Sequence, residues 1–459
     1  MRKFLYALLT IGIIATLLAS CAPAATDAPA VNEPQADEPE AEAPAAEEPA
    51  AEAPASDEVI ELEYWQVDFE GYDTGIAAAI DLFEAEYPNI HVTHVPISYD
   101  EINEKIAVMV PVGEGPDIVN PFYGWVPLWV KSGFLAPLPE DMFPKDEIEA
   151  TYFPVVDAMY IDGQLYGLPF NQSNWAILYN KDMYEAAGIT KLPENFEELR
   201  QAAIDCTQRA DDGTLEVAGY YVEFGTQEHI LWKVMTVKNG QPMFSDDLRT
   251  VTWNDSPAGL ESFKWLTDLV TVDKVMDVGF GEGPGQSFYT ETACMRLGSP
   301  GNLPVARSTN PDLNFGSFPL PVGNADDPEL ANFNQTQYWS INVTTKAVQD
   351  PARAEAAYTF MKFIERPEVA LAMIKAGYGG LPAHRSLMND PYFQEDPEMA
   401  AFMATLDYSH PLSWVDEKGE RDISMEMGDR VILNGEDPAE VFEWGTEQEQ
   451  TLRDEFFNY

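Results

Sequence analysis

The folded part of this chain is predicted to be α/β and large enough for two lobes. Residues 59–65 have the pattern of a strand that ends in an aromatic residue, and residues 90–97 have the pattern of a second strand. Between them, apolar residues recur at helical spacing. This strand–helix–strand order favours layered α/β structure. About 400 residues follow position 58, which is enough for two lobes with a sizeable core.

The helices are predicted from their apolar stripes and their ends. In the first helix the stripe is Ile76, Ile80, Phe83 and Tyr87, and Pro88-Asn89 ends it. Asn195, with Glu198 three residues later, has the pattern of a capping box that opens a helix. Late in the chain the apolar face is Ala354, Tyr358, Met361 and Ile364, with Arg353, Glu355 and Lys362 expected outside it.

The first twenty residues predict export. Met1-Arg2-Lys3 is cationic and precedes an apolar run, residues 4–18, that has the length of a signal-peptide core. The run ends in Leu18-Ala19-Ser20-Cys21, which resembles the bacterial lipobox, whose cysteine is lipidated. Residues 1–20 are therefore predicted to be a lipoprotein signal peptide, with Cys21 anchored to the membrane. The alternative is an ordinary signal peptide followed by a chance cysteine.

Residues 21–58 predict a disordered tether. The segment after Cys21 consists mainly of Ala, Pro and acidic residues, and from Pro29 to Pro54 a proline recurs every five residues. Each proline removes a backbone donor, and the eleven acidic residues face no base. Such a chain cannot bury enough apolar surface to offset the cost of ordering. A recognition tail is the alternative interpretation.

The charge of the chain excludes some partners. The chain has 26 Lys+Arg and 78 Asp+Glu, a net charge of −52. Without the two bases and eleven acids of the first 58 residues, 24 bases and 67 acids remain, a net charge of −43. Such a surface repels nucleic acids and anionic lipids, so nucleic-acid binding is not expected. Solubility explains the acidity, and a salt-rich habitat is a second interpretation.

Cysteine and histidine provide no metal site in the sequence. Export permits a disulfide between Cys206 and Cys294, but two buried free thiols fit the sequence equally well. His91 and His94 are three residues apart in a predicted strand, so their side chains are expected on opposite faces. We expect no metal and no cofactor.

Ten segments in order resemble a known family, the bacterial extracellular solute-binding proteins of the carbohydrate type (family 1), which serve ABC importers. They are AIDLFEAEYPNIHVTHV (79–95), GEGPDIV (113–119), WVKSGFLAPL (129–138), DGQLYGLPF (162–170), LYNKDMYEAAGI (178–189), LPENFEELRQA (192–202), FYTETACMRLGSP (288–300), NFGSFPLP (314–321), WSINVTTKAVQDPARAEAAYTFMKFIERPEVA (339–370) and GYGGLPAHRS (377–386). The stretch beyond Ser386 resembles the family only loosely.

The resemblance implies a two-lobed, periplasmic-binding-protein-like fold of type II, in which the chain crosses between lobes three times. The crossings are expected near 162–165, 337–340 and 376–381. The N-terminal lobe would then comprise 59–163 and 338–375, and the C-terminal lobe 164–337 and 376–459.

The resemblance also indicates where a ligand would bind. A sugar needs flat aromatic platforms and polar groups in the plane of its ring. In the N-terminal lobe the candidates are Trp65, Asp68, Glu70, Asp117, Asn120 and Tyr123, the last in a loop that also holds Trp125. Core packing is the alternative for Trp65, and a structural helix cap is the alternative for Asp117.

The other candidates follow the three crossings. Asn171, Gln172, Asn174 and Trp175 come after the first, Tyr338 and Trp339 lie at the second, Gly377 and Tyr378 lie at the third, and Gly298 and Ser299 form a turn at a strand end. A polar surface loop is the alternative for residues 171–175. Trp232, Trp253 and Trp414 fit core packing better than a ligand platform.

The predicted function is capture of a carbohydrate by lobe closure and delivery to an ABC permease. The expected partners are a mono- or oligosaccharide, the permease subunits and, through the lipid, the membrane; the protein is expected to be a monomer. The resemblance leaves room for polyols and phosphorylated glycerol, but the candidate segments hold few bases, which favours a neutral ligand. Two alternatives are a lipid-anchored glycoside hydrolase, which needs two facing carboxylates, and a binding protein that only signals.

Overall fold

The computed structural model describes residues 59–68, 72–222, 228–378 and 380–458. The predicted signal peptide, Cys21, the tether and Glu70 lie outside these residues. Helices and strands alternate along most of the described chain, so the predicted α/β class is confirmed. None of the helices in these ranges combines the length and the apolar character that a membrane span requires.

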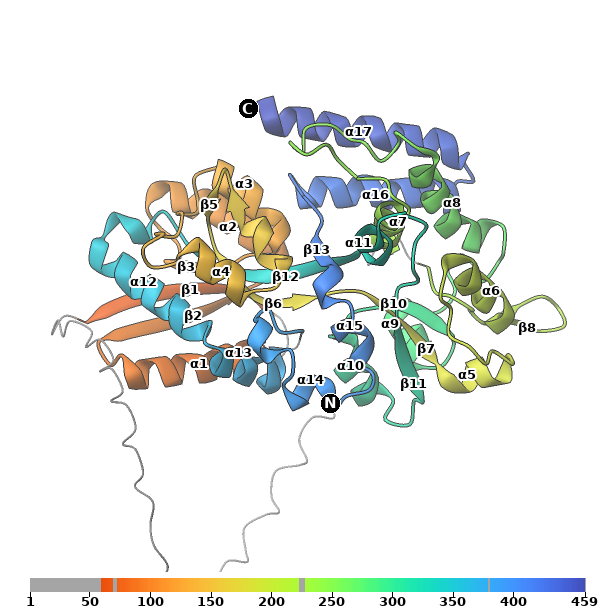
Figure 1. Ribbon diagram of the computed structural model, residues 1–459, viewed down its shortest axis with the longest axis horizontal. Coiled ribbons are helices and arrows are strands. Elements are labelled where there is room, and N and C mark those ends of the chain that lie inside the picture. Colours follow the sequence, from red (N-terminus) through yellow and green to blue (C-terminus); the bar gives the residue numbers. More distant parts are fainter. Residues whose placement is uncertain (1–58, 69–71, 223–227, 379, 459) are drawn as a thin grey trace, which may run out of the picture. The chain divides into compact units, whose positions relative to one another are not determined.

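The strands form two main sheets and two hairpins (Figure 1). In chain order they are β1 (Ile60–Val67), β2 (Ile90–Ile97), β3 (Ile118–Asn120), β4 (Tyr160–Ile161), β5 (Gln164–Leu165), β6 (Leu168–Ser173), β7 (Ala176–Asn180), β8 (Gln208–Arg209), β9 (Leu215–Val217), β10 (Met295–Gly298), β11 (Phe315–Pro319), β12 (Asn334–Val343) and β13 (Ser409–Pro411).

The helices pack around both sheets. They are α1 (Tyr72–Glu86), α2 (Tyr99–Met109), α3 (Val126–Lys131), α4 (Lys145–Thr151), α5 (Lys181–Ala186), α6 (Phe196–Cys206), α7 (Glu228–Lys238), α8 (Pro257–Thr271), α9 (Pro284–Tyr289), α10 (Asn302–Thr309), α11 (Pro328–Asn332), α12 (Pro351–Ile364), α13 (Pro367–Met373), α14 (Pro391–Gln394), α15 (Ala400–Met403), α16 (Glu417–Ile432) and α17 (Pro438–Asn458). Short 3-10 turns include η2 (Tyr123–Trp125) and η3 (Pro154–Met159), and η5 (Ile374–Tyr378) is a π-helical turn.

The larger sheet has the order β13-β12-β3-β1-β2, and β6 pairs with β12. Strand β1 runs parallel to β2 and β3, whereas β12 is antiparallel to β3 and β6. The smaller sheet, β10-β7-β11, is antiparallel. Figure 1 shows β6 and β12 running side by side between the elements around β1–β3 and the elements around the smaller sheet.

The opening strand–helix–strand prediction is confirmed as β1, α1 and β2. Helix α1 ends at Glu86, so Tyr87, the last residue of the predicted stripe, lies just beyond it. Pro88 comes next and has no backbone N–H with which to continue the helix. Phe83 is fully buried and packs edge-on against Phe360 and Phe363 of α12, with ring centroids 5.0 and 5.3 Å apart. The apolar stripes of two helices far apart in sequence therefore meet over the sheet.

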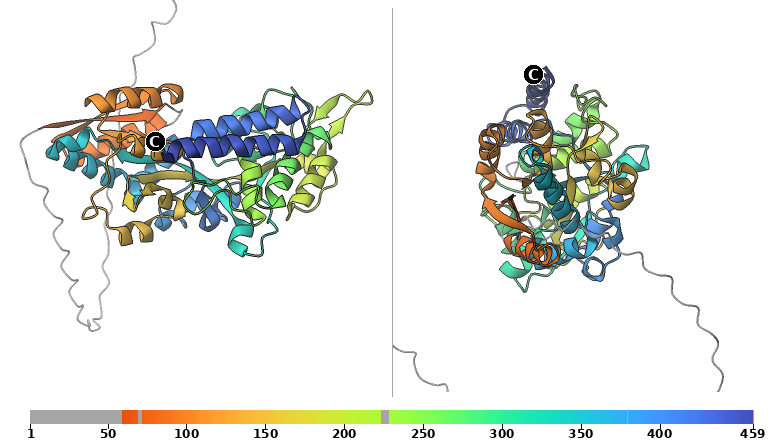
Figure 2. Two further views of the ribbon diagram at one scale, coloured as in Figure 1. Left: turned by 90° about the horizontal axis from the view of Figure 1, so that it is seen from above. Right: turned by 90° about the vertical axis from the view of Figure 1, so that its left-hand side faces the viewer.

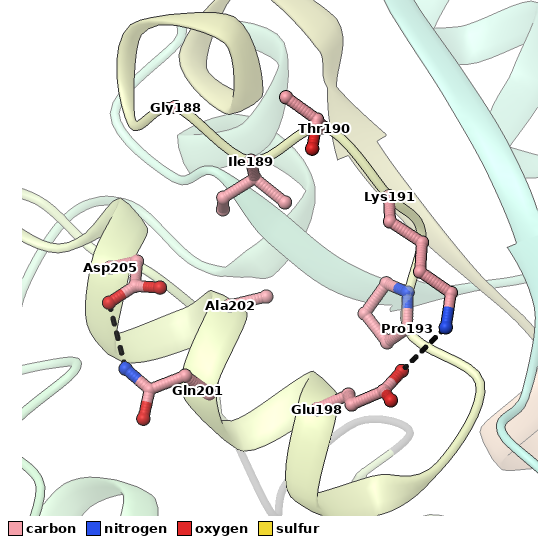
Figure 3. Close-up of a pocket in the computed structure, with 9 residues that line it drawn as sticks. All are labelled: Gly188, Ile189, Thr190, Lys191, Pro193, Glu198, Gln201, Ala202 and Asp205. Atoms are coloured by element: carbon pink, nitrogen blue, oxygen red, sulfur yellow. Dashed lines mark hydrogen bonds and ion pairs between the residues drawn. The ribbon is translucent and has the colours of Figure 1, made fainter.

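The predicted cap of α6 is present with one difference. The Asn195 side chain accepts a hydrogen bond from the amide of Glu198 (2.9 Å), as predicted. The Glu198 carboxylate reaches back to the amide of Glu194, one residue earlier than in a standard capping box. It also faces Lys191, in a shallow pocket of about 250 Å³ beside α6 (Figure 3).

Cys206 and Cys294 form a disulfide, which resolves the alternative that the sequence left open. The bond joins the last residue of α6 to the residue before β10, across a sequence separation of 88 residues. Both cysteines are fully buried. A crosslink over such a long loop restricts the unfolded chain and so stabilises the folded one.

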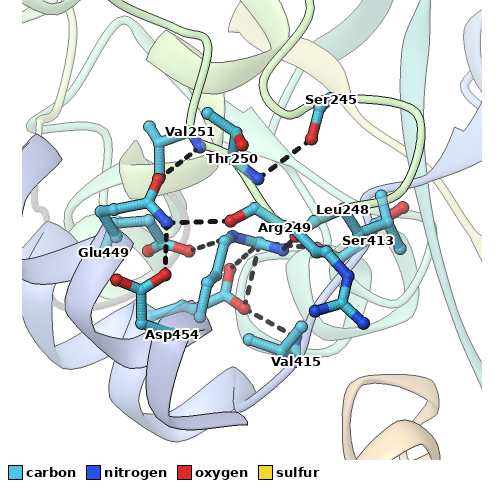
Figure 4. A network of polar contacts seen from close by, with 12 residues as sticks. Ser245, Leu248, Arg249, Thr250, Val251, Ser413, Val415, Glu449 and Asp454 are labelled. Carbon is cyan, nitrogen blue, oxygen red and sulfur yellow. Dashed lines mark hydrogen bonds and ion pairs between the residues drawn. The ribbon is translucent and has the colours of Figure 1, made fainter. Parts of the chain in front are cut away.

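Four charged side chains are buried where α7, α16 and α17 meet: Lys233, Glu420, Glu449 and Arg453, each at most 2% exposed. The Arg453 guanidinium donates to Glu449 (3.0 Å) and to the carbonyls of Leu248 (2.9 Å) and Ser413 (3.1 Å). Figure 4 shows Glu449, Leu248 and Ser413 gathered in this polar network. The Glu420 carboxylate lies 3.4 Å from the same guanidinium. The Arg453 guanidinium therefore links α17 to Glu420 of α16, and the two helices run side by side in Figure 2.

A buried carboxyl group also ends α12. Glu365 accepts a hydrogen bond from the Tyr152 hydroxyl (2.7 Å), and both residues are buried. Burial raises the pKa of Glu365 from its ordinary value near 4.5 to about 8. At neutral pH this carboxyl group is therefore mainly protonated.

Replacing Arg453 with Met should destabilise the protein by about 3–5 kcal/mol, because the Glu420 and Glu449 carboxylates would stay buried without their cation. The control is Arg366→Met, which breaks a half-exposed ion pair with Glu86 (2.8 Å) and should cost at most about 1 kcal/mol. Urea unfolding followed by circular dichroism measures both. Equal losses for the two variants would contradict the assigned role of Arg453.

The stability of the protein should fall as pH rises from about 4.5 to about 8, because over this range folded Glu365 keeps a proton that the unfolded chain releases. Glu365→Gln removes this penalty. At pH 9 the variant should exceed the wild type by up to about 5 kcal/mol, since each pH unit between the two pKa values contributes about 1.4 kcal/mol. At pH 4 the difference should vanish. Thermal unfolding over this pH range measures it, with exposed Glu368→Gln as control; parallel curves for wild type and Glu365→Gln would refute the assignment.

Candidate functional site

A cluster of aromatic side chains surrounds Trp339, near the middle of β12. Trp339 is half-buried, and its ring centroid lies 5.6 Å from Phe122, 5.8 Å from Trp125 and 6.4 Å from Tyr99. The pairing of β12 with β6 shifts its register between Trp339 and Ser340. Such an irregularity re-aims side chains locally. We name Tyr99, Phe122, Trp125 and Trp339 the aromatic cluster.

A second, fully buried layer lies beside this cluster. The rings of Tyr123 and Tyr338 stack with centroids 4.8 Å apart. The Tyr123 hydroxyl accepts hydrogen bonds from Gln335 (2.7 Å) and from the indole of Trp414 (2.5 Å). Burial raises the pKa of the Tyr123 hydroxyl, so it stays protonated. The predicted residues Tyr123 and Tyr338 therefore support the aromatic cluster from inside.

The predicted polar segment after the first crossing is buried, so the surface-loop alternative is wrong. Gln172 donates to the carbonyl of Pro382 (2.7 Å) and accepts from Thr336. Asn174 donates to the carbonyl of Phe402 and to the hydroxyls of Thr405 and Ser409. Asn171 is 5% exposed, and the Trp175 indole donates to Gln335. These side chains join β6 to segments that lie more than 150 residues later.

The N-terminal candidates divide between buried and exposed positions. Trp65 is 4% exposed, and its indole donates to Glu63. Asn120 is buried and donates to the carbonyl of Ser340 (2.7 Å), which lies next to Trp339. Asp68 is exposed at the end of β1, and Glu70 lies outside the described residues.

Asp117 is fully buried, and protein groups occupy its carboxylate. It accepts from the amide of Glu63 (2.9 Å) and the Arg353 guanidinium (2.8 Å), and Lys346 lies 3.5 Å away. Arg353, expected outside the apolar face of α12, therefore points toward this carboxylate. The geometry matches the structural alternative for Asp117, although the ion pair fixes α12 rather than capping a helix.

The remaining candidates lie on other elements. Gly298 ends β10 of the smaller sheet, and a Cβ there would come within 2.6 Å of Leu178. The Ser299 amide donates to Asn302 (2.8 Å). Gly377 is exposed and has a φ of 120°, a conformation that favours glycine, in η5 next to Tyr378.

Glu417 and Arg421 were missed from the sequence. They lie one turn apart at the start of α16 and form an ion pair (3.0 Å). The Tyr99 hydroxyl accepts from Arg421 (3.3 Å) and lies 3.4 Å from Glu417. Burial raises the pKa of Glu417, and the Arg421 charge opposes that rise. Their i,i+4 spacing is visible in the sequence, but it is common on solvent-exposed helices and this region resembles the family only loosely.

The glycine at position 124 allows the start of α16 to lie close to η2. A Cβ on Gly124, in η2 between Tyr123 and Trp125, would lie 2.8 Å from the Cβ of Glu417. The first turn of α16 can therefore lie directly on the backbone of η2.

A cavity of about 400 Å³ opens further along α16. Its lining was also missed, and consists of Tyr221, Val222, Met276, Val278, Gly279, Phe280, Gly281, Gly283, Met425, Gly428, Asp429, Ile432 and Leu433. The Tyr221 hydroxyl donates to the carbonyl of Phe280 (2.7 Å), which fixes the glycine-rich loop that forms one wall.

Both features border α16. Glu417 and Arg421 lie in its first turns, and Met425 and Asp429 line the cavity further along. At 3.6 residues per turn, Asp429 lies about 120° around the helix from Glu417. At 1.5 Å per residue, the two residues are about 18 Å apart along the axis.

Comparison with known proteins gives relatives of low identity but wide coverage. A maltotriose-binding protein of Pyrococcus abyssi is 22% identical over 313 residues, 68% of this chain and 64% of that protein. An sn-glycerol-3-phosphate-binding periplasmic protein of Pectobacterium atrosepticum is 24% identical over 339 residues, 69% of this chain and 72% of that protein.

A solved structure, the ABC substrate-binding protein of Listeria monocytogenes in complex with cycloalternan, aligns with a TM-score of 0.72 at 22% identity, covering 88% of this chain and 100% of that one. The fold is therefore the periplasmic-binding-protein fold, as predicted. The family model for the bacterial extracellular solute-binding proteins matches residues 66–371. The chain belongs to this family, whose members bind solutes rather than transform them.

Proposed function

We propose that this protein captures a neutral sugar, most simply an oligosaccharide, and delivers it to the permease of an ABC importer. The observation that carries the proposal is the aromatic cluster around half-buried Trp339, with the Glu417–Arg421 pair beside it. Ring faces stack on sugar rings at low entropic cost, and charged groups hydrogen-bond strongly to hydroxyls.

The relatives support a sugar but leave a second class open. One relative is named a maltotriose-binding protein, and one similar solved structure is a complex with cycloalternan. Another relative is named an sn-glycerol-3-phosphate-binding protein. We favour a neutral ligand because Arg421, the cation beside the aromatic cluster, is already paired with Glu417.

The cavity along α16 supports a ligand longer than one ring. It holds aromatic side chains, Tyr221 and Phe280, and a carboxylate, Asp429. A ligand that contacts both the aromatic cluster and this cavity would have to span the length of α16 between Glu417 and Asp429, about 18 Å along the axis. We therefore add Tyr99, Phe280, Glu417, Arg421 and Asp429 to the proposed ligand set.

Among the sequence-predicted residues, Trp339, Asp68 and the Gly298–Ser299 turn stay in this set, together with Gly377 and Tyr378. Glu70 also stays, as a prediction from the sequence. Trp65, Asp117, Asn120, Tyr123, Asn171, Gln172, Asn174, Trp175 and Tyr338 are buried, and we propose that they position the site.

Capture would proceed by closure of two lobes, 59–163 with 338–375 and 164–337 with 376–459. The β6–β12 pair supports this arrangement, because both strands run from the elements around β1–β3 toward the elements around the smaller sheet. A ligand that contacts both lobes only in the closed state shifts the equilibrium by its differential affinity. A lipid on Cys21 and the tether would keep the protein near the permease.

Trp339→Ala should weaken binding of a neutral trisaccharide such as maltotriose at least about tenfold, since one stacked ring contributes about 1 kcal/mol beyond the area it buries. Trp444, a half-buried indole on α17, provides the control variant Trp444→Ala. Isothermal titration calorimetry against a panel of mono-, di- and trisaccharides measures both. Unchanged affinity in Trp339→Ala would exclude this cluster as the site.

Cys21→Ser should release the exported protein from the membrane fraction, because no thiol would remain for the lipid. Fractionation of cells that produce either form measures it, with the exposed-site variant Glu368→Gln as a control that keeps Cys21 and the disulfide. A wild-type protein found only in the soluble fraction would refute the anchor while leaving the proposed binding function unaffected.

A further inference from the structure

The charged side chains at the proposed ligand site disfavour a negatively charged ligand. Glu417 is 6% exposed and Arg421 is 27% exposed, so the guanidinium is the part of the pair that solvent reaches. The Cβ and Cγ of Glu417 lie against the backbone of η2, and its carboxylate lies beside the Tyr99 hydroxyl. The guanidinium carbon lies 6.0 Å from the centroid of the Tyr99 ring.

In this geometry the Arg421 guanidinium already donates to two groups of the protein. Its Nη1 donates both to Glu417 (3.0 Å) and to Tyr99 (3.3 Å). A phosphate group would have to compete with a carboxylate that is held in place by packing. A sugar hydroxyl, which is neutral, could accept from the guanidinium without breaking the pair.

The cavity adds to this effect. Among the described residues that line it, Asp429 carries a charge and none is basic. Together Glu417, Arg421 and Asp429 sum to one negative charge along α16. The protein as a whole also carries −52, so its field opposes the approach of anions.

We propose that the Glu417–Arg421 pair is the specificity determinant that makes this site select uncharged sugars over phosphorylated ligands. The inference rests on the proposed function. Glu417 masks the charge of Arg421 toward phosphate, and Arg421 still donates to hydroxyls. Removing the carboxylate charge leaves an arginine available to phosphate, beside an aromatic cluster that a small ligand can reach.

The test is calorimetric titration at pH 7.5 and low salt with two probes, maltotriose and sn-glycerol 3-phosphate. The wild type should bind maltotriose at least 100-fold more tightly than sn-glycerol 3-phosphate. Glu417→Gln should bind the phosphate at least tenfold more tightly than the wild type does, and that gain should fall as salt is added.

The matched control lies on the same helix. Lys418 and Asp422 form an exposed i,i+4 pair (2.5 Å), with side chains 74% and 52% exposed. Asp422→Asn removes one acid and leaves one base unpaired, as Glu417→Gln does, but away from the aromatic cluster. It should leave the affinities for both probes unchanged.

A second variant covers the case in which Glu417→Gln does not fold, which a thermal melt would reveal. Arg421→Gln changes a partly exposed side chain and should weaken maltotriose binding at least tenfold without any gain for phosphate. Wild-type affinity for maltotriose in this variant would overturn the proposal.

The outcomes separate the two proposals. A wild type that binds no neutral sugar would refute the proposed function. A wild type that binds sugar, with Glu417→Gln gaining no more phosphate affinity than Asp422→Asn, would refute only the role of the pair. A wild type that binds the phosphate as tightly as the sugar would also overturn the inference.

Discussion

The side chain of Gln335 joins the segments on which the site is built. Its amide nitrogen donates to the Tyr123 hydroxyl, and its amide oxygen accepts from the Trp175 indole. Trp414 donates to the same Tyr123 hydroxyl. Because an unsatisfied buried polar group costs free energy, these bonds oblige η2, β6–β7, β12 and the segment before α16 to stay together. The aromatic cluster next to Tyr123 depends on that junction.

The elements around the junction are fixed by other buried charges and amides. Asp117 pairs with Arg353 and so holds α12 against the start of β3, while Arg453 pairs with Glu420 and holds α17 against α16. Paired charges of this kind add little net stability, but breaking one pair is costly, which favours one arrangement over alternatives. Glu420, which is buried on α16, pairs with Arg453 of α17 and so helps to position the helix that bears Glu417, Arg421 and Asp429.

In this arrangement the buried and the half-buried aromatic residues have different roles. Tyr123, Tyr338 and Trp175 are buried, and their polar or stacking contacts are with the protein itself. Trp339, Tyr99 and Phe122 retain exposed surface. A binding protein needs both, since a platform that contacts a ligand must be held rigid by residues that do not. The same logic explains why many residues near the proposed site are buried amides.

The sequence by itself determined the α/β class, the first strand–helix–strand unit, the cap of α6 and the family, because periodicity, capping and ordered motifs are local signals. It also predicted a ligand role for Trp339, which lies in the aromatic cluster. Only the tertiary structure decided that Asp117 and Gln172 are buried among protein partners, and that Cys206 and Cys294 pair. It alone brought Glu417 and Arg421 to Tyr99, more than 300 residues away in the chain. Exposure and pairing between distant residues arise from packing, and no local pattern encodes them.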